Sequence, residues 1–423
     1  MTGYFAGRSL ADLGRGLRSG SDTSAGLLAR ALESVDPSLN AFVTLDPEGA
    51  AAAARQADEE LASGGDRGPL HGVPVAVKDI IDVAGLPTGM GSAHFAGNVA
   101  KEDAGCVTRL RAAGAVIVGK TGTHEFAYGG SGDVSVDGPC RNPRDPERIS
   151  GGSSSGSAVA VAAGMVPLAL GTDTGGSVRI PAAFCGIAGF KPHYGAIPTD
   201  GVFPLSPSLD HVGVLAATAA DCRTAYRALA DLPHREDAPP GGGPAWIVPF
   251  ETDTDVERTV RALFPDAPSE RVDLRGLRRV FVGIQDSEAY DIHAERVAEA
   301  PELYQPATLA RLERAARTSG WHYVRAVRER ERYAREVAAL LDRYDLLVLP
   351  TVPITAPLIG ATDGPMGPLQ PSLVSLTCAW NILGLPALSV PAGTVRGLPV
   401  GVQLVTRRGA EDLLFAAAGT LPD

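Results

Sequence analysis

Hydrophobic and polar positions follow two different periods along the first part of the chain. Apolar residues recur at helical spacing over 24–35 and 47–62, which predicts two helices. The apolar runs 73–77 and 115–118 predict buried strands, and a helical pattern over 104–113 separates them. Strands that alternate with helices predict an α/β fold with a largely parallel sheet and helices on both faces.

The pattern continues through the middle and the end of the chain. Residues 129–146 are rich in glycine, proline and turn pairs, which predicts a loop. Segment 151–164 starts as a Gly/Ser turn and runs into an Ala/Val helix, and a strand is predicted at 166–170. A long charged helix is expected at 307–341, followed by a strand at 346–349.

One stretch, 239–244, resembles a linker because it is rich in proline and glycine. Strand and helix patterns occur on both sides of it, so we interpret it as an insertion point within one domain. The chain has 423 residues and a hydrophobic fraction of 44%, which supports a sizeable core.

Charge and cysteine content exclude several classes of protein. The net charge of −11 and the lack of a basic cluster with interleaved aromatic residues argue against a nucleic-acid partner. No apolar run approaches the ~18 residues of a membrane span, and residues 1–17 do not resemble a signal peptide. Five scattered cysteines without a CxxC pair, and no histidine pair at ligand spacing, argue against a metal site. We therefore expect a cytoplasmic protein.

Lysine is rare in this chain, because arginine supplies almost all of the positive charge. The lysines are Lys78, Lys101, Lys120 and Lys191. Only an amine, and not a guanidinium group, can lose its proton near neutral pH. Some of these lysines are therefore candidates for positions where arginine cannot serve, although chance explains any single one equally well.

Two Gly/Ser clusters are candidates for chemistry. The cluster at 151–157 lacks both the P-loop ending and the G-x-G-x-x-G spacing, so a serine-capped helix start explains it better than a phosphate site. In the second cluster, Gly175 and Gly176 precede Ser177. Paired glycines let consecutive amides turn toward one point, as a nucleophilic serine with an oxyanion hole requires. A tight turn between a strand and a helix would give the same pattern.

A nucleophilic serine needs a base to activate it. His193 and His211 lie nearest in sequence, but neither occurs in a pattern that fixes a triad partner. Lys78 and Lys120 each end a predicted buried strand, where burial lowers the pKa of an amine enough to make it a base. These residues alone do not separate the two lysines.

Several segments resemble the amidase signature family. They are GVPVAVKDIID at 72–82, residues 119–121 and 124–126, the long run GGSSSGSAVAVAAGMVPLALGTDTGGSVRIPAAFCGIAGFK at 151–191, residues 208–213, and residues 397–403. The resemblance is close over 69–215 and weaker over 305–423. It implies one domain over 1–423, with a mixed, mostly parallel central sheet, a signature core at 69–215 and a shortened variable region at 232–305.

The resemblance also assigns roles to individual residues. By motif position, Lys78 corresponds to the family's base, Ser153 to its bridging serine and Ser177 to its nucleophile. The implied oxyanion donors are the backbone N–H groups of Thr174, Gly175, Gly176 and Ser177. Supporting polar positions are implied for Ser154, Asp173 and Arg179. The resemblance further implies a cis peptide bond between Gly152 and Ser153, and a structural role for Lys120.

The chain departs from the family pattern at a few positions. Ser155 stands where glycine is frequent, His193 where threonine is frequent, and Ala196 where arginine is common. These departures lie where the family shapes substrate entry, so they leave the identity of the substrate open. They do not change the three catalytic positions, so the expected chemistry stays the same. The Arg-Tyr-Asp-Gly run typical of the tRNA-dependent glutamine amidotransferase subunit is missing, because Arg343–Asp345 continues into Leu346, which argues against that role.

The resemblance implies an amidohydrolase that cleaves a small-to-medium carboxylic amide through an acyl-serine intermediate, without a metal or organic cofactor. The alternative is an amide-forming acyl transferase that uses the same intermediate in a biosynthetic pathway. A catalytically idle binding subunit is disfavoured, because the three catalytic positions are intact. The expected partner is a small-molecule amide rather than nucleic acid or membrane, and a homodimer is possible.

Overall fold

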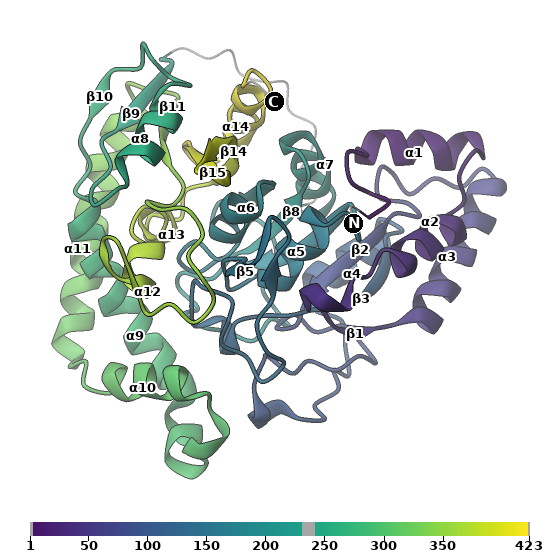
Figure 1. Ribbon diagram of the computed structural model, residues 1–423, viewed down its shortest axis with the longest axis horizontal. Helices are drawn as coiled ribbons and strands as arrows, with labels where there is room; N and C mark the ends of the chain where they lie inside the picture. The colour runs from purple at the N-terminus through teal and green to yellow at the C-terminus, as the bar shows by residue number, and fades with distance from the viewer. Residues whose placement is uncertain (1–2, 231–241, 422–423) are drawn as a thin grey trace.

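The computed structural model describes residues 3–230 and 242–421, and the first half of the predicted linker at 239–244 lies outside them. Strands from both sides of the undescribed segment join one eleven-stranded sheet (Figure 1). In spatial order its strands are β1 (Phe42–Leu45), β3 (Val116–Thr121), β2 (Pro74–Lys78), β6 (Leu168–Thr172), β8 (Val212–Ala216), β7 (Ala188–Lys191), β14 (Ala387–Val395), β15 (Leu398–Val405), β11 (Leu346–Pro350), β9 (Pro244–Ile247) and β10 (Ser269–Glu270).

The sheet is mixed, as predicted. Parallel neighbours occur on its two flanks, where β3, β2 and β6 run together and β11, β9 and β10 run together. The strands between these flanks pair in antiparallel fashion, from β6 through β8, β7, β14 and β15 to β11. The edge strand β1 is also antiparallel to its neighbour β3.

Helices cover both faces of the sheet. On β7, a Cβ at Gly189 would meet Ala182 of one helix, whereas the next residue, Phe190, stacks its ring 4.9 Å from Tyr226 of another helix. Because successive residues of a strand point to opposite faces, these two helices lie on opposite sides of the sheet. In Figure 1 the N-terminal helices α1–α3 lie at one end of the molecule and α9–α11 at the other.

The α-helices have the following bounds: α1 Leu10–Ser19, α2 Ser24–Glu33, α3 Pro47–Ala62, α4 Gly105–Ala112, α5 Ser155–Ala162, α6 Arg179–Cys185, α7 Ala219–Ala230, α8 Thr254–Arg261, α9 Leu274–Glu299, α10 Pro306–Ala315, α11 Gly320–Leu341, α12 Leu369–Leu373, α13 Cys378–Ile382 and α14 Glu411–Ala418. Short hairpins form from β4 (Arg141–Asn142) with β5 (Asp145–Ile149) and from β12 (Asp363–Gly364) with β13 (Gly367–Pro368).

Two predictions of secondary structure were wrong in part. The long helix expected at 307–341 is two helices, because Ser319 adopts an extended conformation and α11 begins afresh at Gly320. The loop predicted over 129–146 contains β4 and the start of β5, because Asn142 donates to the Ile149 carbonyl and stabilises a short hairpin. The helix α9 was not predicted, although it is the longest described helix.

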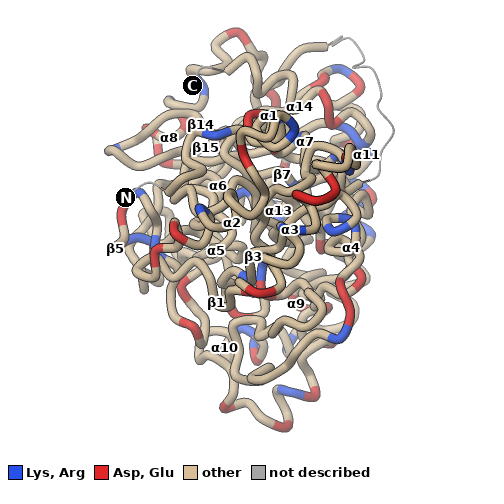
Figure 2. Tube along the Cα trace, turned by 90° about the vertical axis from the view of Figure 1, so that its right-hand side faces the viewer, with Lys and Arg blue, Asp and Glu red and all other residues tan. Residues whose placement is uncertain are grey.

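Acidic and basic residues are interspersed along the trace in Figure 2, without one continuous basic stretch in that view. In the described parts of the chain, no helix is both long enough and apolar enough to cross a membrane.

Candidate active site

The predicted base, Lys78, is the last residue of strand β2. The run Val75–Val77 before it is fully buried, because both neighbouring strands and the covering helices pack against it. Lys78 itself has no exposed surface, and its Nζ lies 2.7 Å from Ser153 Oγ and 2.6 Å from Thr172 Oγ1. The strands β3, β2 and β6 are parallel, so their carboxyl ends meet at one edge of the sheet, where α/β proteins commonly form their sites.

The environment of Lys78 makes its amine a base near neutral pH. Burial lowers the pKa of Lys78 to about 7, while the carboxylates of Asp173 and Asp210 act in the opposite direction. An amine with this pKa is largely uncharged in mildly alkaline solution, so its lone pair is free to take a proton from a neighbouring hydroxyl.

Ser153 lies between the turn after Gly151 and the first residues of α5. The Gly152–Ser153 peptide bond is cis, as predicted. The backbone carbonyl of Ser153 accepts from the His124 N–H at 3.2 Å, while its side chain contacts Lys78. This bonding fixes both the backbone and the hydroxyl of Ser153 beside the end of β2.

Ser154 joins the two serine clusters. Its backbone N–H donates to the Ser177 carbonyl at 3.1 Å, and its hydroxyl donates to the Thr172 carbonyl at 3.1 Å. A Cβ on Gly171 would lie 2.6 Å from Ser154 Oγ, so glycine is required there for this close approach. The structure therefore brings the backbones of Ser153 and Ser177 together, although 24 positions separate them in the sequence.

Ser177 occupies the turn between β6 and α6. It is 8% exposed, whereas Lys78 and Ser153 are completely buried, so Ser177 is the member of the group that solvent reaches. The preceding Gly176 has φ +136°, a conformation that residues with a side chain rarely adopt. A Cβ on Gly175 would lie 2.5 Å from Phe281 of α9, so both glycines are needed for this turn.

Asp173 shapes the same turn from inside. Its carboxylate accepts from the N–H of Gly176 at 2.8 Å and from that of Val178 at 3.1 Å. It also accepts two bonds from the Arg179 guanidinium, at 2.8 and 3.0 Å. Burial acts to raise the pKa of Asp173, but the Arg179 charge and its hydrogen bonds hold that pKa well below its ordinary value.

Residues from the C-terminal part complete the surroundings of Arg179. The guanidinium donates to Gln403 Oε1 and to Asn381 Oδ1, each at 2.6 Å, and to the Thr377 carbonyl at 3.0 Å. Asn381 also donates to Asp173 Oδ1 at 2.9 Å. Sequence reasoning missed these partners. Gln403 ends a segment that carries the family resemblance, but nothing in the sequence pointed to Asn381.

Lys120, the other candidate base, has a different environment. Its Nζ lies 3.0 Å from Asp79 Oδ1 and also donates to the Pro87 carbonyl at 2.9 Å and to Thr88 Oγ1 at 3.0 Å. Burial lowers the pKa of Lys120, and the Asp79 charge acts against this. Lys120 thus pairs with the residue after Lys78 and, unlike Lys78, faces a carboxylate directly, which fits the structural role implied for it.

The positions that depart from the family pattern have specific partners. The ring of His193 contacts Glu411 at the start of α14, and the Ser155 hydroxyl donates to the Gly122 carbonyl at 3.3 Å. Ala196 is partly buried against the core. None of these side chains forms a bond with Lys78, Ser153 or Ser177 among the bonds described.

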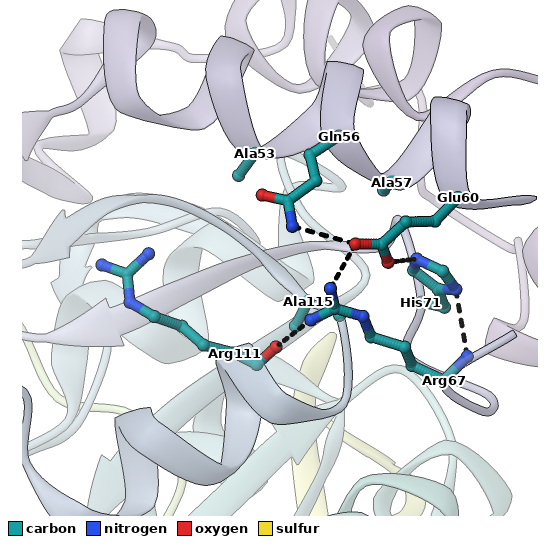
Figure 3. A pocket seen from close by; sticks show the side chains of 9 residues that line it. Ala53, Gln56, Ala57, Glu60, Arg67, His71, Arg111 and Ala115 are labelled. Carbon is teal, nitrogen blue, oxygen red and sulfur yellow. Dashed lines mark hydrogen bonds and ion pairs between the residues drawn. The ribbon is translucent and has the colours of Figure 1, made fainter. Parts of the chain in front are cut away.

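A separate pocket lies between α3 and the segment before β2 (Figure 3). Gln56 and Arg67 both donate to Glu60, whose other oxygen lies 3.2 Å from His71 Nε2. None of the predicted site residues lines this pocket. We therefore place the candidate active site at the carboxyl ends of β2 and β6.

Comparison with known proteins agrees with this fold. A sequence profile of the family described as Amidase matches residues 26–242 and 255–415. A glutamyl-tRNA(Gln) amidotransferase subunit from Symbiobacterium thermophilum is 37% identical, over 91% of this chain and 89% of that protein. A solved amidase structure is 36% identical with a TM-score of 0.91, over 97% of this chain and 98% of its own. The solved structure of the peptide amidase of Stenotrophomonas maltophilia is 28% identical with a TM-score of 0.80, over 98% of this chain and 96% of its own.

The fold and the comparisons define an enzyme of the amidase signature type, a class that includes both amidases and amidotransferase subunits. The chain belongs to the amidase signature family. Within that family, similarity extends both to amidases and to an amidotransferase subunit, the role that the missing Arg-Tyr-Asp-Gly run argued against.

Proposed function

We propose that the protein cleaves the C–N bond of a small-to-medium carboxylic amide through an acyl-Ser177 intermediate, and that water then releases the acid. One observation carries the acylation step of this proposal: a buried lysine with a lowered pKa bonds Ser153 at 2.7 Å, and the next residue, Ser154, donates its backbone N–H to the Ser177 carbonyl. The arrangement places a base beside the Ser153 hydroxyl and holds the Ser177 backbone against the neighbouring residue Ser154.

In this mechanism neutral Lys78 takes the proton of Ser153 while Ser153 takes that of Ser177, whose oxygen attacks the amide carbonyl. Gly176 N–H is already bonded to Asp173, so the amides of Thr174, Gly175 and Ser177 are the candidates for stabilising the oxyanion. Reversing the relay protonates the leaving amine and breaks the C–N bond. Water then attacks the ester by the same relay, which yields the carboxylic acid and restores Ser177.

Amide transfer is a second candidate, and one observation favours it. The curated relative at 37% identity is named as a subunit of an amidotransferase. Acylation of Ser177 is common to both candidates, and only the acceptor differs. A transferase of that kind would also work with partner subunits, because the relative is named as one subunit of an amidotransferase.

The acceptor can be tested by partitioning. The purified chain is supplied with aliphatic, aryl and amino-acid amides, and free acid and ammonia are measured with and without hydroxylamine. We expect acid to form without added amine, and hydroxamate to appear only at high hydroxylamine concentration. Capture of most of the acyl group at low hydroxylamine concentration, with slow acid formation in its absence, would instead identify amide transfer as the native reaction.

A further inference from the structure

The hydroxyl of Thr172 has a defined role toward Lys78. Lys78 Nζ makes two bonds to side chains, with Ser153 Oγ and with Thr172 Oγ1. If the neutral amine accepts a proton from Ser153, its own N–H must donate to Thr172 Oγ1. The O–H of Thr172 then points away from Lys78 and toward another acceptor.

Thr172 also lines a small, partly open cavity. It measures about 10 Å³, close to the space that one water molecule needs. Its polar lining comes from threonines, Asp210 and His211, and its apolar lining includes Ile80 and Phe203. A cavity of this size, with the Thr172 hydroxyl and the acceptor side chains of Asp210 and His211 in a lining that is otherwise largely apolar, has room for one bridging molecule.

His211 contributes an acceptor to this region. Its Nδ1 lies 2.6 Å from the Leu209 carbonyl, which places the ring proton on that nitrogen and leaves Nε2 as an acceptor. Nε2 is buried and has no hydrogen-bond partner among the described residues. Burial keeps the pKa of His211 well below its ordinary value, and Lys191 acts in the same direction, so the ring is neutral.

Asp210 lies on the same wall and is firmly held. Its Oδ2 accepts from the backbone N–H groups of Leu205 at 2.9 Å and Ser206 at 3.0 Å. Its Oδ1 accepts from Thr174 Oγ1 at 2.5 Å, and Thr174 starts the turn that leads to Ser177. One carboxylate therefore contacts the oxyanion turn and faces the cavity behind Thr172.

We propose that Asp210 is a positioning residue of the active site, which fixes the oxyanion turn through Thr174 and, across the one-water cavity, orients the Thr172 hydroxyl so that its oxygen faces Lys78. This inference rests on the proposed function of Lys78 as the base. It assigns a task to Asp210, which the sequence analysis included only within the segment 208–213 of the resemblance.

The charge of Asp210 gives the proposal a measurable consequence. Asp173 and Asp210 are the carboxylates that favour the protonated form of Lys78, and the buried His124 also faces this lysine. Glu288 faces Asp210, whose pKa burial raises to about 6, so Asp210 is ionised in the range where Lys78 titrates. Removing this negative charge must make Lys78 lose its proton at lower pH.

The test follows the rate of covalent labelling of Ser177 by a fluorophosphonate between pH 5 and 9, which needs no knowledge of the substrate. In Asp210→Asn the amide can still accept from the backbone and donate to Thr174, so the geometry is kept while the charge is removed. We expect the acid limb of the labelling profile to move down by about half a pH unit. At pH 6.5, where Asp210 is mostly ionised in the wild-type protein, the fraction of the plateau rate would then rise roughly twofold.

Asp221→Asn is the matched control. Asp221 is also buried and also accepts from a backbone N–H, that of Leu10, and from a threonine hydroxyl, that of Thr218, but it belongs to α7. We expect the acid limb of the labelling profile of Asp221→Asn to lie at the same pH as that of the wild-type protein. An unchanged limb in a folded Asp210→Asn protein would overturn the inference, whereas failure to label the wild-type protein would overturn the proposed function instead.

A second pair of variants tests the cavity if Asp210→Asn does not fold. Thr172→Ser keeps the hydroxyl and Thr172→Val removes it at nearly the same volume. We expect Thr172→Ser to label at close to the wild-type rate and Thr172→Val to label more than tenfold more slowly at the plateau. Equal plateau labelling rates in Thr172→Ser and Thr172→Val would show that the Thr172 hydroxyl does not contribute to the activation of Ser177, and would refute the proposal.

Discussion

Arg179 forms a completely buried, two-pronged ion pair with Asp173, with Nη2 2.8 Å from Oδ1 and Nε 3.0 Å from Oδ2. Asp173 holds the turn before Ser177, and Arg179 reaches Asn381 and Gln403 in the C-terminal part. The pair therefore ties the Ser177 turn to strands and helices that are about 200 positions away in the sequence.

Replacing Arg179 with methionine should destabilise the fold strongly. The change leaves the Asp173 carboxylate buried without its partner, which costs about 3–5 kcal/mol in the free energy of unfolding. Urea denaturation followed by circular dichroism measures this loss. Arg148→Met is the control, because its pair with Asp145 is partly exposed and should contribute less than about 1 kcal/mol. Equal losses in the two variants would contradict the assignment.

Ser177 is expected to be the only covalent nucleophile. A fluorophosphonate should label the wild-type protein at this residue and should fail to label Ser177→Ala. Ser153→Ala should retain slow labelling at Ser177, because the nucleophile is present but its proton relay is interrupted. Mass spectrometry of the labelled peptides provides the measurement, and a labelled serine elsewhere in Ser177→Ala would rule out the assignment.

Activity should rise with pH toward a plateau. Burial lowers the pKa of Lys78 to about 7, and only the deprotonated amine can act as the base, so the active form dominates above that value. Lys78→Arg should be as inactive as Lys78→Ala, because a guanidinium stays protonated. Amide turnover from pH 5 to 9 tests both statements, and near-normal turnover by Lys78→Arg would disprove them.

Gly176→Ala should lose activity. The residue has φ +136°, and a Cβ there would lie 2.3 Å from Thr377 Oγ1 and 2.8 Å from Ile180 Cδ1. The turn must therefore shift, which displaces the amides beside Ser177 and should lower the labelling rate at least tenfold. Gly320→Ala is the control, because nothing lies within 4 Å of its added Cβ. A Gly176→Ala variant that labels like Gly320→Ala would show that the turn tolerates a side chain.

The amino-acid sequence by itself determined much of this protein. Local hydrophobic patterning located β2, β3 and β6 to within a few residues, because buried strands need short apolar runs. The bounds of α3 matched the prediction at both ends, from Pro47 to Ala62. The motif around Ser177 made that residue a candidate nucleophile, because paired glycines let consecutive amides turn toward one point, and the resemblance favoured this interpretation over a plain turn.

Residue patterns alone did not separate the two lysines, and the resemblance assigned the base to Lys78; only the tertiary structure shows the physical reason why their environments differ. In the pairing of β2 with β3, Lys120 stands beside Val77 and Thr121 beside Lys78, so the two lysines point to opposite faces of the sheet. One therefore meets Ser153 and the other meets Asp79. A register of this kind depends on contacts between strands. For the same reason the sequence did not predict the role of Asn381 or the cavity that Asp210 lines. The residues that meet there lie far apart along the chain and come into contact only after folding.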